Sequence, residues 1–193
     1  MNTVHPSLVE KERRQKRNNR ITTNVFFSLI MILLLIIVMN AFVYMTIEVE
    51  GLSMWPTLNN GDVLKVNKRI SASHGDIVII QKYSKEDKCY ILVIKRVIAM
   101  GGDKVEIKDG KVYVNDKLLD EPYVPDEINT NMPDGSDYSY TLKDDEVFYL
   151  GDNRINSEDS RGSGCCKEED VLGVLEDWAY NMRGFFGFVH NLF

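Results

Sequence analysis

Histidine and cysteine are scarce in this sequence, which contains three of each among 193 residues. An odd number of cysteines does not describe a disulfide framework, and no spacing of cysteine and histidine resembles a zinc site. Two of the cysteines are adjacent, and such a pair closes only through a strained ring. We therefore expect no metal, no cofactor and three free thiols that pack as small apolar residues: Cys89, Cys165 and Cys166.

Charge is absent from residues 25–45, VFFSLIMILLLIIVMNAFVYM. As a helix rising ~1.5 Å per residue, this run spans ~31 Å, close to the thickness of the hydrocarbon core of a bilayer. A secretory signal peptide is the alternative, but its apolar core has only ~7–15 residues and ends at an A-x-A-like site. The following TIEVEG contains no such site, and no polar face marks the run as a buried soluble helix. We predict an uncleaved transmembrane anchor.

The two flanks of this apolar run differ in charge. Residues 1–24 carry six Lys or Arg against two Glu, whereas the whole chain has a net charge of −6. The positive-inside rule therefore predicts a basic N-terminus in the cytoplasm and residues 46–193 on the far side of the membrane. Because the exported part is acidic, we expect the lipid bilayer as a partner and no nucleic acid.

The exported part is predicted to be mostly β. Apolar, β-branched runs at 74–83, 88–100, 146–153 and 171–180 favour strands. Residues 105–124 alternate around Asp109-Gly110, a strong signal for a two-residue hairpin turn, and residues about 104–146 are expected to form a small β lobe. Proline and polar residues indicate a loop at 122–137. The aromatic tail 184–193 is too short to span a bilayer; core packing is favoured over contact with the membrane interface.

The stretch GLSMWPTL (51–58) places a serine just after the apolar run. It is not the G-x-S-x-G turn of α/β-hydrolases, because Trp55 replaces the second glycine. Ser53 becomes a nucleophile only if a neighbour accepts its proton. The histidines suit this role poorly: His5 lies before the anchor, His74 opens a strand, and His190 is in the aromatic tail. Trp55 is equally compatible with the membrane interface and with the core.

A lysine inside an apolar strand is the other candidate base. Lys95 stands in ILVIKRVI (91–98), and in a strand it shares a face with Ile91 and Val93. Burial there disfavours the ammonium form and lowers the pKa from ~10.4 toward ~8. Arg96 on the opposite face keeps its charge and needs a carboxylate. An edge strand with both side chains reaching to solvent is the rival interpretation, but GDNRINSEDSR (151–161) offers polar partners for two buried cations.

Four stretches in this order, SMWPTL, HGDIVII, KRVIAMGGD and GDNRINSEDSR, resemble the sequence boxes of type I signal peptidases. These are membrane-bound serine proteases that remove signal peptides from exported proteins. The resemblance covers about residues 20–180, and the lobe is similar to that of compact Gram-positive enzymes. It implies a coiled β-sheet fold after one transmembrane helix, in a single-pass protein of the bacterial cell membrane. It also implies that Ser53 is the nucleophile and Lys95 the general base, because the Ser-His branch has histidine at position 95.

The resemblance further implies roles for the residues around this dyad. Ser157 would orient the amine of Lys95, and the backbone N–H of Ser53 would donate to the oxyanion. Some relatives have a serine two positions before the nucleophile, where this chain has Gly51, so the second oxyanion donor stays open. Arg96 would pair with Asp152, while Asp159 and Arg161 would brace the loop. The signal peptide would bind as an extended strand, with pockets for small residues near Met54, Leu58, Val93 and Ile94.

Two other functions fit parts of this pattern. A self-cleaving repressor-type protein would also use a Ser-Lys dyad, but the anchor and the lack of a DNA-binding segment count against it. A non-enzymatic, membrane-anchored binding protein would make the Ser53, Lys95 and Ser157 stretches coincidental. Cleavage of a preprotein separates these alternatives.

Overall fold

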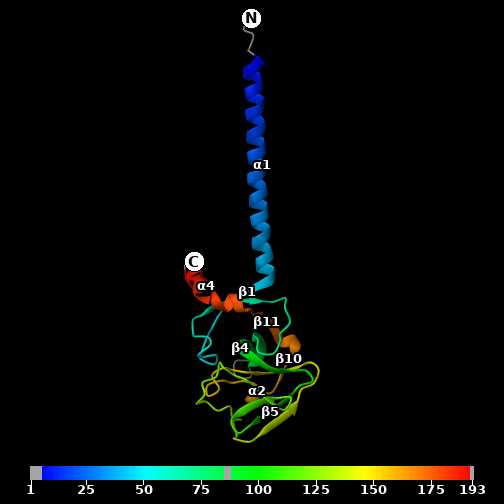
Figure 1. Ribbon diagram of the computed structural model, residues 1–193, viewed down its shortest axis with the longest axis vertical. Helices are drawn as coiled ribbons and strands as arrows, with labels where there is room; N and C mark the ends of the chain where they lie inside the picture. Colours follow the sequence, from blue (N-terminus) through cyan, green and yellow to red (C-terminus); the bar gives the residue numbers. More distant parts are fainter. Residues whose placement is uncertain (1–5, 85–87, 192–193) are drawn as a thin grey trace. The chain divides into compact units, whose positions relative to one another are not determined.

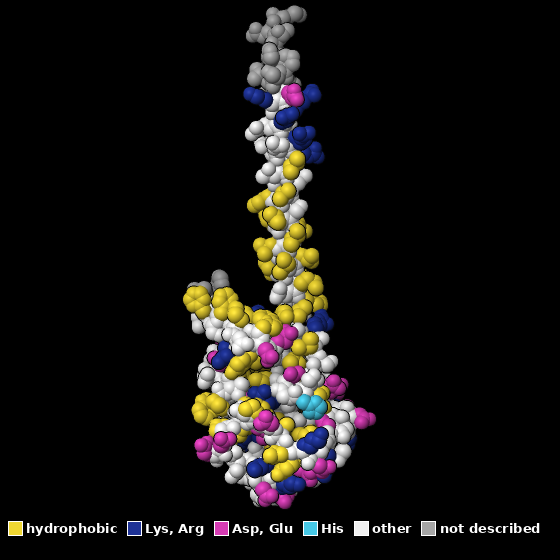
Figure 2. All heavy atoms as spheres, viewed as in Figure 1, with side chains coloured by type: hydrophobic (Ala, Val, Ile, Leu, Met, Phe, Trp, Pro, Cys, Tyr) yellow, Lys and Arg dark blue, Asp and Glu magenta, His cyan; other side chains and the backbone are white. Residues whose placement is uncertain are grey.

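The computed structural model describes residues 6–84 and 88–191, which divide into an N-terminal helix and a β-rich unit (Figure 1). Helix α1 (Pro6–Val43) starts with its only proline at the first position, where a missing N–H costs nothing. Its part Arg13–Val43 is long and apolar enough to cross a membrane. Hydrophobic side chains are exposed along it (Figure 2). The helix ends at Val43, so Tyr44 and Met45, predicted to belong to the span, lie in a strand.

The larger sheet has seven strands within the described residues, all paired antiparallel. Their order is β1-β2-β11-β3-β4-β9-β10, with bounds β1 (Tyr44–Glu48), β2 (Val63–Asn67), β11 (Val171–Leu175), β3 (Ile77–Ser84), β4 (Cys89–Met100), β9 (Glu146–Leu150) and β10 (Cys166–Lys167). The three predicted runs at 74–83, 88–100 and 146–153 correspond to β3, β4 and β9. Strand β4 pairs with β3 from Cys89 to Arg96, and β9 pairs with it only from Arg96 onward. One edge of β4 is therefore unpaired over residues 89–95 within the described structure, next to the turn that contains Ser53.

A second sheet has the order β7-β6-β5-β8, with bounds β7 (Lys117–Leu118), β6 (Lys111–Val114), β5 (Lys104–Lys108) and β8 (Tyr138–Thr141). All four strands fall inside the predicted lobe. Strands β5 and β6 form the expected hairpin around Asp109 and Gly110, whose φ angles of 53° and 75° suit a type I′ turn. The two sheets share a core that includes Ile98, Phe148 and Leu150 from the first and Val105 and Ile107 from the second.

The region after β11 differs from the prediction of a strand over 171–180. The strand ends at Leu175, and two short helices follow, α3 (Asp177–Asn181) and α4 (Arg183–His190). Glu176 caps the first helix in extended conformation and Asp177 stands in its first turn, where a negative charge is favourable. Phe186 packs against the core cluster that contains Leu64, so the predicted core packing holds for one side of the tail only.

Short elements complete the unit: α2 (Ser160–Ser163) follows the polar loop after β9, and a 3-10 turn η1 (Glu168–Asp170) precedes β11. The three cysteines are free. Burial raises the pKa of Cys165 to about 11 and that of Cys166 to about 12, so both are held as thiols. For these two, this agrees with the expectation of packing residues rather than reactive thiolates. The expectation is wrong for Cys89, which is exposed at the start of β4.

Candidate active site

Two loops bring the serine-containing turn to the open edge of β4. Residues 51–58 form a turn after β1, and the loop that follows β9 holds it from the other side. Asn153 donates from its backbone N–H to the Ser53 carbonyl (3.0 Å) and from its side chain to the Leu52 carbonyl (3.0 Å). The turn is thereby fixed against the same loop that the sequence singled out as polar.

Ser53 and Lys95 meet in hydrogen-bonding contact. Lys95 Nζ lies 2.7 Å from Ser53 Oγ, and the lysine is only 3% exposed. Burial lowers its pKa from 10.5 to about 8; the charge of Lys82 adds to this shift, while that of Asp159 opposes it. An amine with a pKa of about 8 is neutral in about a tenth of the molecules at pH 7 and in about half at pH 8. The neutral amine can accept the serine proton.

The histidines are engaged elsewhere. His74 Nε2 lies 2.6 Å from Asp103 Oδ2, and His190 Nε2 lies 4.0 Å from a carboxylate oxygen of Glu48. No hydrogen bond joins either ring to Ser53 within the described part of the chain. The geometry therefore agrees with the preference for lysine over histidine as the partner of Ser53.

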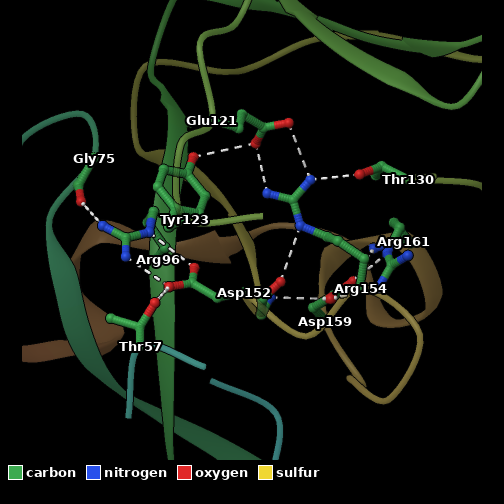
Figure 3. A network of polar contacts seen from close by, with 11 residues as sticks. Thr57, Gly75, Arg96, Glu121, Tyr123, Thr130, Asp152, Arg154, Asp159 and Arg161 are labelled. Atoms are coloured by element: carbon green, nitrogen blue, oxygen red, sulfur yellow. Dashed lines mark hydrogen bonds and ion pairs between the residues drawn. The ribbon is translucent and has the colours of Figure 1, made fainter. Parts of the chain in front are cut away.

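The arginine next to Lys95 forms the ion pair that the sequence called for. Arg96 Nε and Nη2 contact the two oxygens of Asp152 at 2.8 and 2.6 Å, and its Nη1 donates to the Gly75 carbonyl at 2.8 Å (Figure 3). Burial disfavours the guanidinium charge, but the hydrogen bonds and charge of Asp152 outweigh it and raise the pKa of Arg96. Thr57, from the serine turn, also donates to Asp152. This carboxylate therefore links β4 to the turn that contains Ser53.

A second buried ion pair braces the loop after β9. Both oxygens of Asp159 accept from Arg161, at 2.8 Å each, and Asp159 Oδ2 also accepts from the Gly151 N–H (3.1 Å). Burial acts to raise the pKa of Asp159, but the bonds and charge of Arg161 and the Gly151 N–H lower it overall. Asp159 also caps α2, so the predicted bracing pair is present.

Ser157 lies at the site but does not make the predicted contact with Lys95. Its Oγ is buried and has no hydrogen-bond partner among the described residues. It packs directly on Gly151: a Cβ at that glycine would collide with both Ser157 Oγ and the Ser53 carbonyl. Only glycine therefore fits at position 151, where the loop after β9 passes between Ser53 and Ser157. The orienting role of Ser157 stays a prediction.

A third ion pair was not expected from the sequence. Arg154 donates through Nη1 and Nη2 to the two oxygens of Glu121, through Nη1 also to Thr130, and through Nε to the Gly151 carbonyl at 3.0 Å (Figure 3). Its side chain is fully buried. Tyr123 lies between the two networks, with Arg96 3.9 Å above its ring centroid. These contacts hold the segment after β7 against the loop that follows β9. The sequence shows that Arg154 is a charged residue in the polar loop, but no neighbouring residue indicates that Glu121 is its partner.

A cleft of about 410 Å³ runs beside the dyad. Its walls are Ile47–Glu50 on one side and Ile91–Lys95 on the other, with Ser53 and Met54 between them. Met54, Val93 and Ile94 line it as predicted. Leu58 does not line it in the described structure, because it is fully buried in the core with Val66 and Ile79. Trp55 is 46% exposed, which excludes ordinary core packing.

Gly51 occupies a conformation that favours glycine. Its φ is +88°, in the left-handed region, and its N–H donates to Asn60 Oδ1 at 2.8 Å. That N–H is therefore committed to the turn rather than directed at the cleft. The geometry explains why glycine stands here. The role of the Ser53 N–H as oxyanion donor stays a prediction.

Comparison with known proteins gives consistent matches. The model of the family described as "Signal peptidase, peptidase S26" matches residues 22–178. Signal peptidase I V of Bacillus subtilis (strain 168) is 35% identical over 153 residues, covering 72% of this chain and 88% of that protein. Signal peptidase I of Bacillus caldolyticus is 34% identical over 152 residues, covering 72% and 80%.

A crystal structure of a signal peptidase I from Enterococcus faecalis aligns with 55% of this chain and 98% of its own, at 28% identity and a TM-score of 0.45. The family match spans most of the β-rich unit and the end of α1, the helix that fits membrane anchoring. This chain therefore belongs to the signal peptidase family S26, and it is a serine protease whose relatives are signal peptidases I.

Proposed function

We propose that the chain cleaves N-terminal signal peptides from exported preproteins with Ser53 as nucleophile and Lys95 as general base. The observation that carries this is the 2.7 Å contact between Ser53 Oγ and a lysine that is almost wholly buried. Neutral Lys95 takes the Ser53 proton as Oγ attacks the scissile carbonyl. The peptide C–N bond breaks, and the lysinium returns the proton to the departing amine.

The second half of the reaction uses the same two groups. Lys95, neutral again, accepts a proton from water, which attacks the acyl-enzyme ester. The ester C–O bond breaks, the new carboxyl terminus leaves, and the lysinium returns the proton to Ser53 Oγ. The Ser53 backbone N–H donates to the negatively charged oxygen in both steps. We assign the orienting of the amine to Ser157, whose Oγ is buried next to Gly151 and can accept or donate a hydrogen bond.

The substrate binds as an extended segment between two unpaired edges. The open edge of β4 before Lys95 and the segment Ile47–Glu50 face each other across the cleft. An added strand gains backbone hydrogen bonds there, as in other cases of strand addition. Met54, Val93 and Ile94 line the cleft near Ser53, and we assign to them the exclusion of large side chains that an A-x-A-like cleavage motif requires.

The apolar helix places this chemistry at the membrane. With the basic residues before the span in the cytoplasm, the β-rich unit lies outside, where signal peptides emerge. Enzyme and substrate are then both confined to the bilayer and meet in two dimensions.

The direct test is cleavage of a preprotein by the full chain in detergent. Ser53→Ala and Lys95→Ala should each lower kcat by roughly 10³-fold or more, because either change removes a proton-transfer or bond-forming group. Lys117→Ala, at an exposed lysine of the second sheet, is the matched control and should cleave normally. Normal cleavage by Ser53→Ala or Lys95→Ala contradicts the mechanism. No cleavage by the wild type on several preproteins favours the binding-protein alternative.

A second arm tests the cleavage motif. Replacing the small residue before the scissile bond of the preprotein by phenylalanine should abolish processing at that bond. The same replacement in the residue after the bond is the control. Equal cleavage of the two altered preproteins would show that the cleft does not select small residues.

A further inference from the structure

The wall of the cleft that continues from β1 carries two exposed carboxylates. Glu48 and Glu50 line the cleft and are exposed, whereas Val49 between them is buried in the core. The opposite wall is apolar except for Lys95, whose side chain is almost wholly buried. Among the described residues that line the cleft, the two glutamates are therefore the only charged side chains open to solvent.

Little positive charge from the chain itself offsets these carboxylates. Glu48 has one ion-pair contact, with His190 Nε2 at 4.0 Å, which is the outer limit for such a pair. Glu50 has no ion pair in the part of the chain that the structure describes. Lys65, which stands opposite Thr46 on β2, pairs with neither glutamate within the same residues. The wall therefore presents a negative charge to whatever occupies the cleft.

The backbone of the two glutamates is directed at the cleft. Val49 donates its N–H to the Asp62 carbonyl at 2.8 Å and accepts from the Gly61 N–H at 2.8 Å, so both of its polar groups point away from the cleft. Successive residues of an extended segment direct their N–H and C=O groups to opposite edges. Glu48 and Glu50 therefore offer theirs to a strand added in the cleft, and their side chains stand on its outer face.

The period of a strand decides which substrate side chains meet these carboxylates. Counted back from the scissile bond, the small residues of an A-x-A-like motif occupy positions −1 and −3. In an extended segment these two share a face, which is turned toward Met54 and Val93 in the cleft. The residue between them, at position −2, then points to the outer face. That residue is free in size but lies beside Glu48 and Glu50.

We propose that Glu48 and Glu50 select the charge of the signal peptide at position −2, favouring a basic residue there and disfavouring an acidic one. The inference rests on the proposed function, since it requires a signal peptide in the cleft. Exposed pairs of opposite charge favour contact by up to about fivefold, and like charges oppose it to a similar extent. Lysine at −2 should therefore exceed glutamate by about tenfold in kcat/KM at low ionic strength.

Three preproteins that differ only at position −2, with lysine, glutamine or glutamate there, test the selection. The full chain in a non-ionic detergent cleaves them at low and at high salt. We expect kcat/KM to fall from lysine through glutamine to glutamate, and the ratio of lysine to glutamate to drop to about twofold or less near 1 M salt, where charges are screened within about 3 Å. Equal cleavage of all three at low salt overturns the inference and leaves the proposed function standing. Cleavage of none overturns both.

Removal of the two charges assigns the selection to this wall. Glu48→Gln with Glu50→Gln should bring the low-salt ratio of lysine to glutamate close to one. Asp126→Asn with Glu127→Gln, at two exposed acidic residues in the loop after β7, removes the same charge elsewhere and should keep the wild-type ratio. A ratio that survives the change in the cleft overturns the inference. An equal loss in the control also overturns it, because the net charge of the chain would then be the cause.

Discussion

The burial of Lys95 has a thermodynamic cost that can be measured apart from catalysis. Its pKa falls from 10.5 to about 8 because the folded chain disfavours the ammonium form. At ~1.4 kcal/mol per pKa unit, this costs about 3 kcal/mol of folding free energy when the lysine is protonated. Lys95→Met keeps the volume and removes the charge. It also removes the hydrogen bond to Ser53, worth about 1 kcal/mol, so we expect a net stabilisation of about 2 kcal/mol near pH 7.

The sign of the pH dependence follows from the direction of the shift. Below pH about 8 the lysine is protonated in both states and the penalty is complete. Between about 8 and 10.5 the unfolded chain keeps a proton that the folded chain has released, so wild-type stability rises with pH. Above that range both states are neutral and the penalty is gone. The advantage of Lys95→Met should therefore be largest near neutral pH and shrink as the pH approaches 10.5.

Thermal unfolding of the full chain in detergent, followed by circular dichroism, measures this. An increase of about 2 kcal/mol in a unit of this size raises Tm by about 4–8 °C at pH near 7. Lys117→Met, which removes an exposed lysine, is the control and should leave Tm nearly unchanged at both pH values. If Lys95→Met lowers Tm at neutral pH, or if its difference from the wild type does not change with pH, burial does not lower the pKa of Lys95. The argument for its role as base would then fail.

Three further outcomes follow from the same site. The kcat/KM of the wild type should rise with an apparent pKa of about 8, because only neutral Lys95 accepts the serine proton; a flat profile from acid to alkaline pH contradicts a lysine base. Asp152→Ala strands the buried charge of Arg96 and should cost about 3–5 kcal/mol in denaturant unfolding; a loss below about 1 kcal/mol would mean that the pair is solvated. Gly151→Ala should lower kcat sharply, because its Cβ strikes the Ser53 carbonyl, whereas Gly162→Ala, which meets nothing within 4 Å, should not; equal activities would show that the loop relaxes freely.

The dyad was predictable because its two halves carry local signals. The alternation of a β-strand assigns Lys95 to a face, and its apolar neighbours indicate that the face is buried. The structure agrees: Lys95 lies opposite Val78 on β3, a fully buried valine. The same reasoning predicted that Arg96 needs a carboxylate. A buried charge restricts its own surroundings so strongly that the residue type alone reveals the need for a partner.

The identity of distant partners was less accessible. Arg154 and Glu121 are 33 residues apart. Glu121 follows β7 of the smaller sheet and Arg154 follows β9 of the larger one, so neither helical nor strand periodicity relates the two positions. Leu58 is an apolar residue close to Ser53 in the sequence, as a pocket residue would be, but the turn points its side chain into the core. In both cases the sequence gives the chemical character of the side chain, and the packing of the whole unit decides its direction.

The C-terminal segment is the clearest case in which the sequence gives the character of the side chains and the packing decides their direction. The run 171–180 has strand-like composition, but pairing with β3 ends at Leu175 opposite Ile77, and no strand of the described residues pairs with the chain beyond that point. The chain satisfies them internally by forming helices. Once helical, the segment has two faces, one toward the core through Phe186 and one outward through Phe185. The prediction of core packing is therefore correct for one face of the helix only, because neighbouring residues of a helix at the edge of a small unit point in different directions.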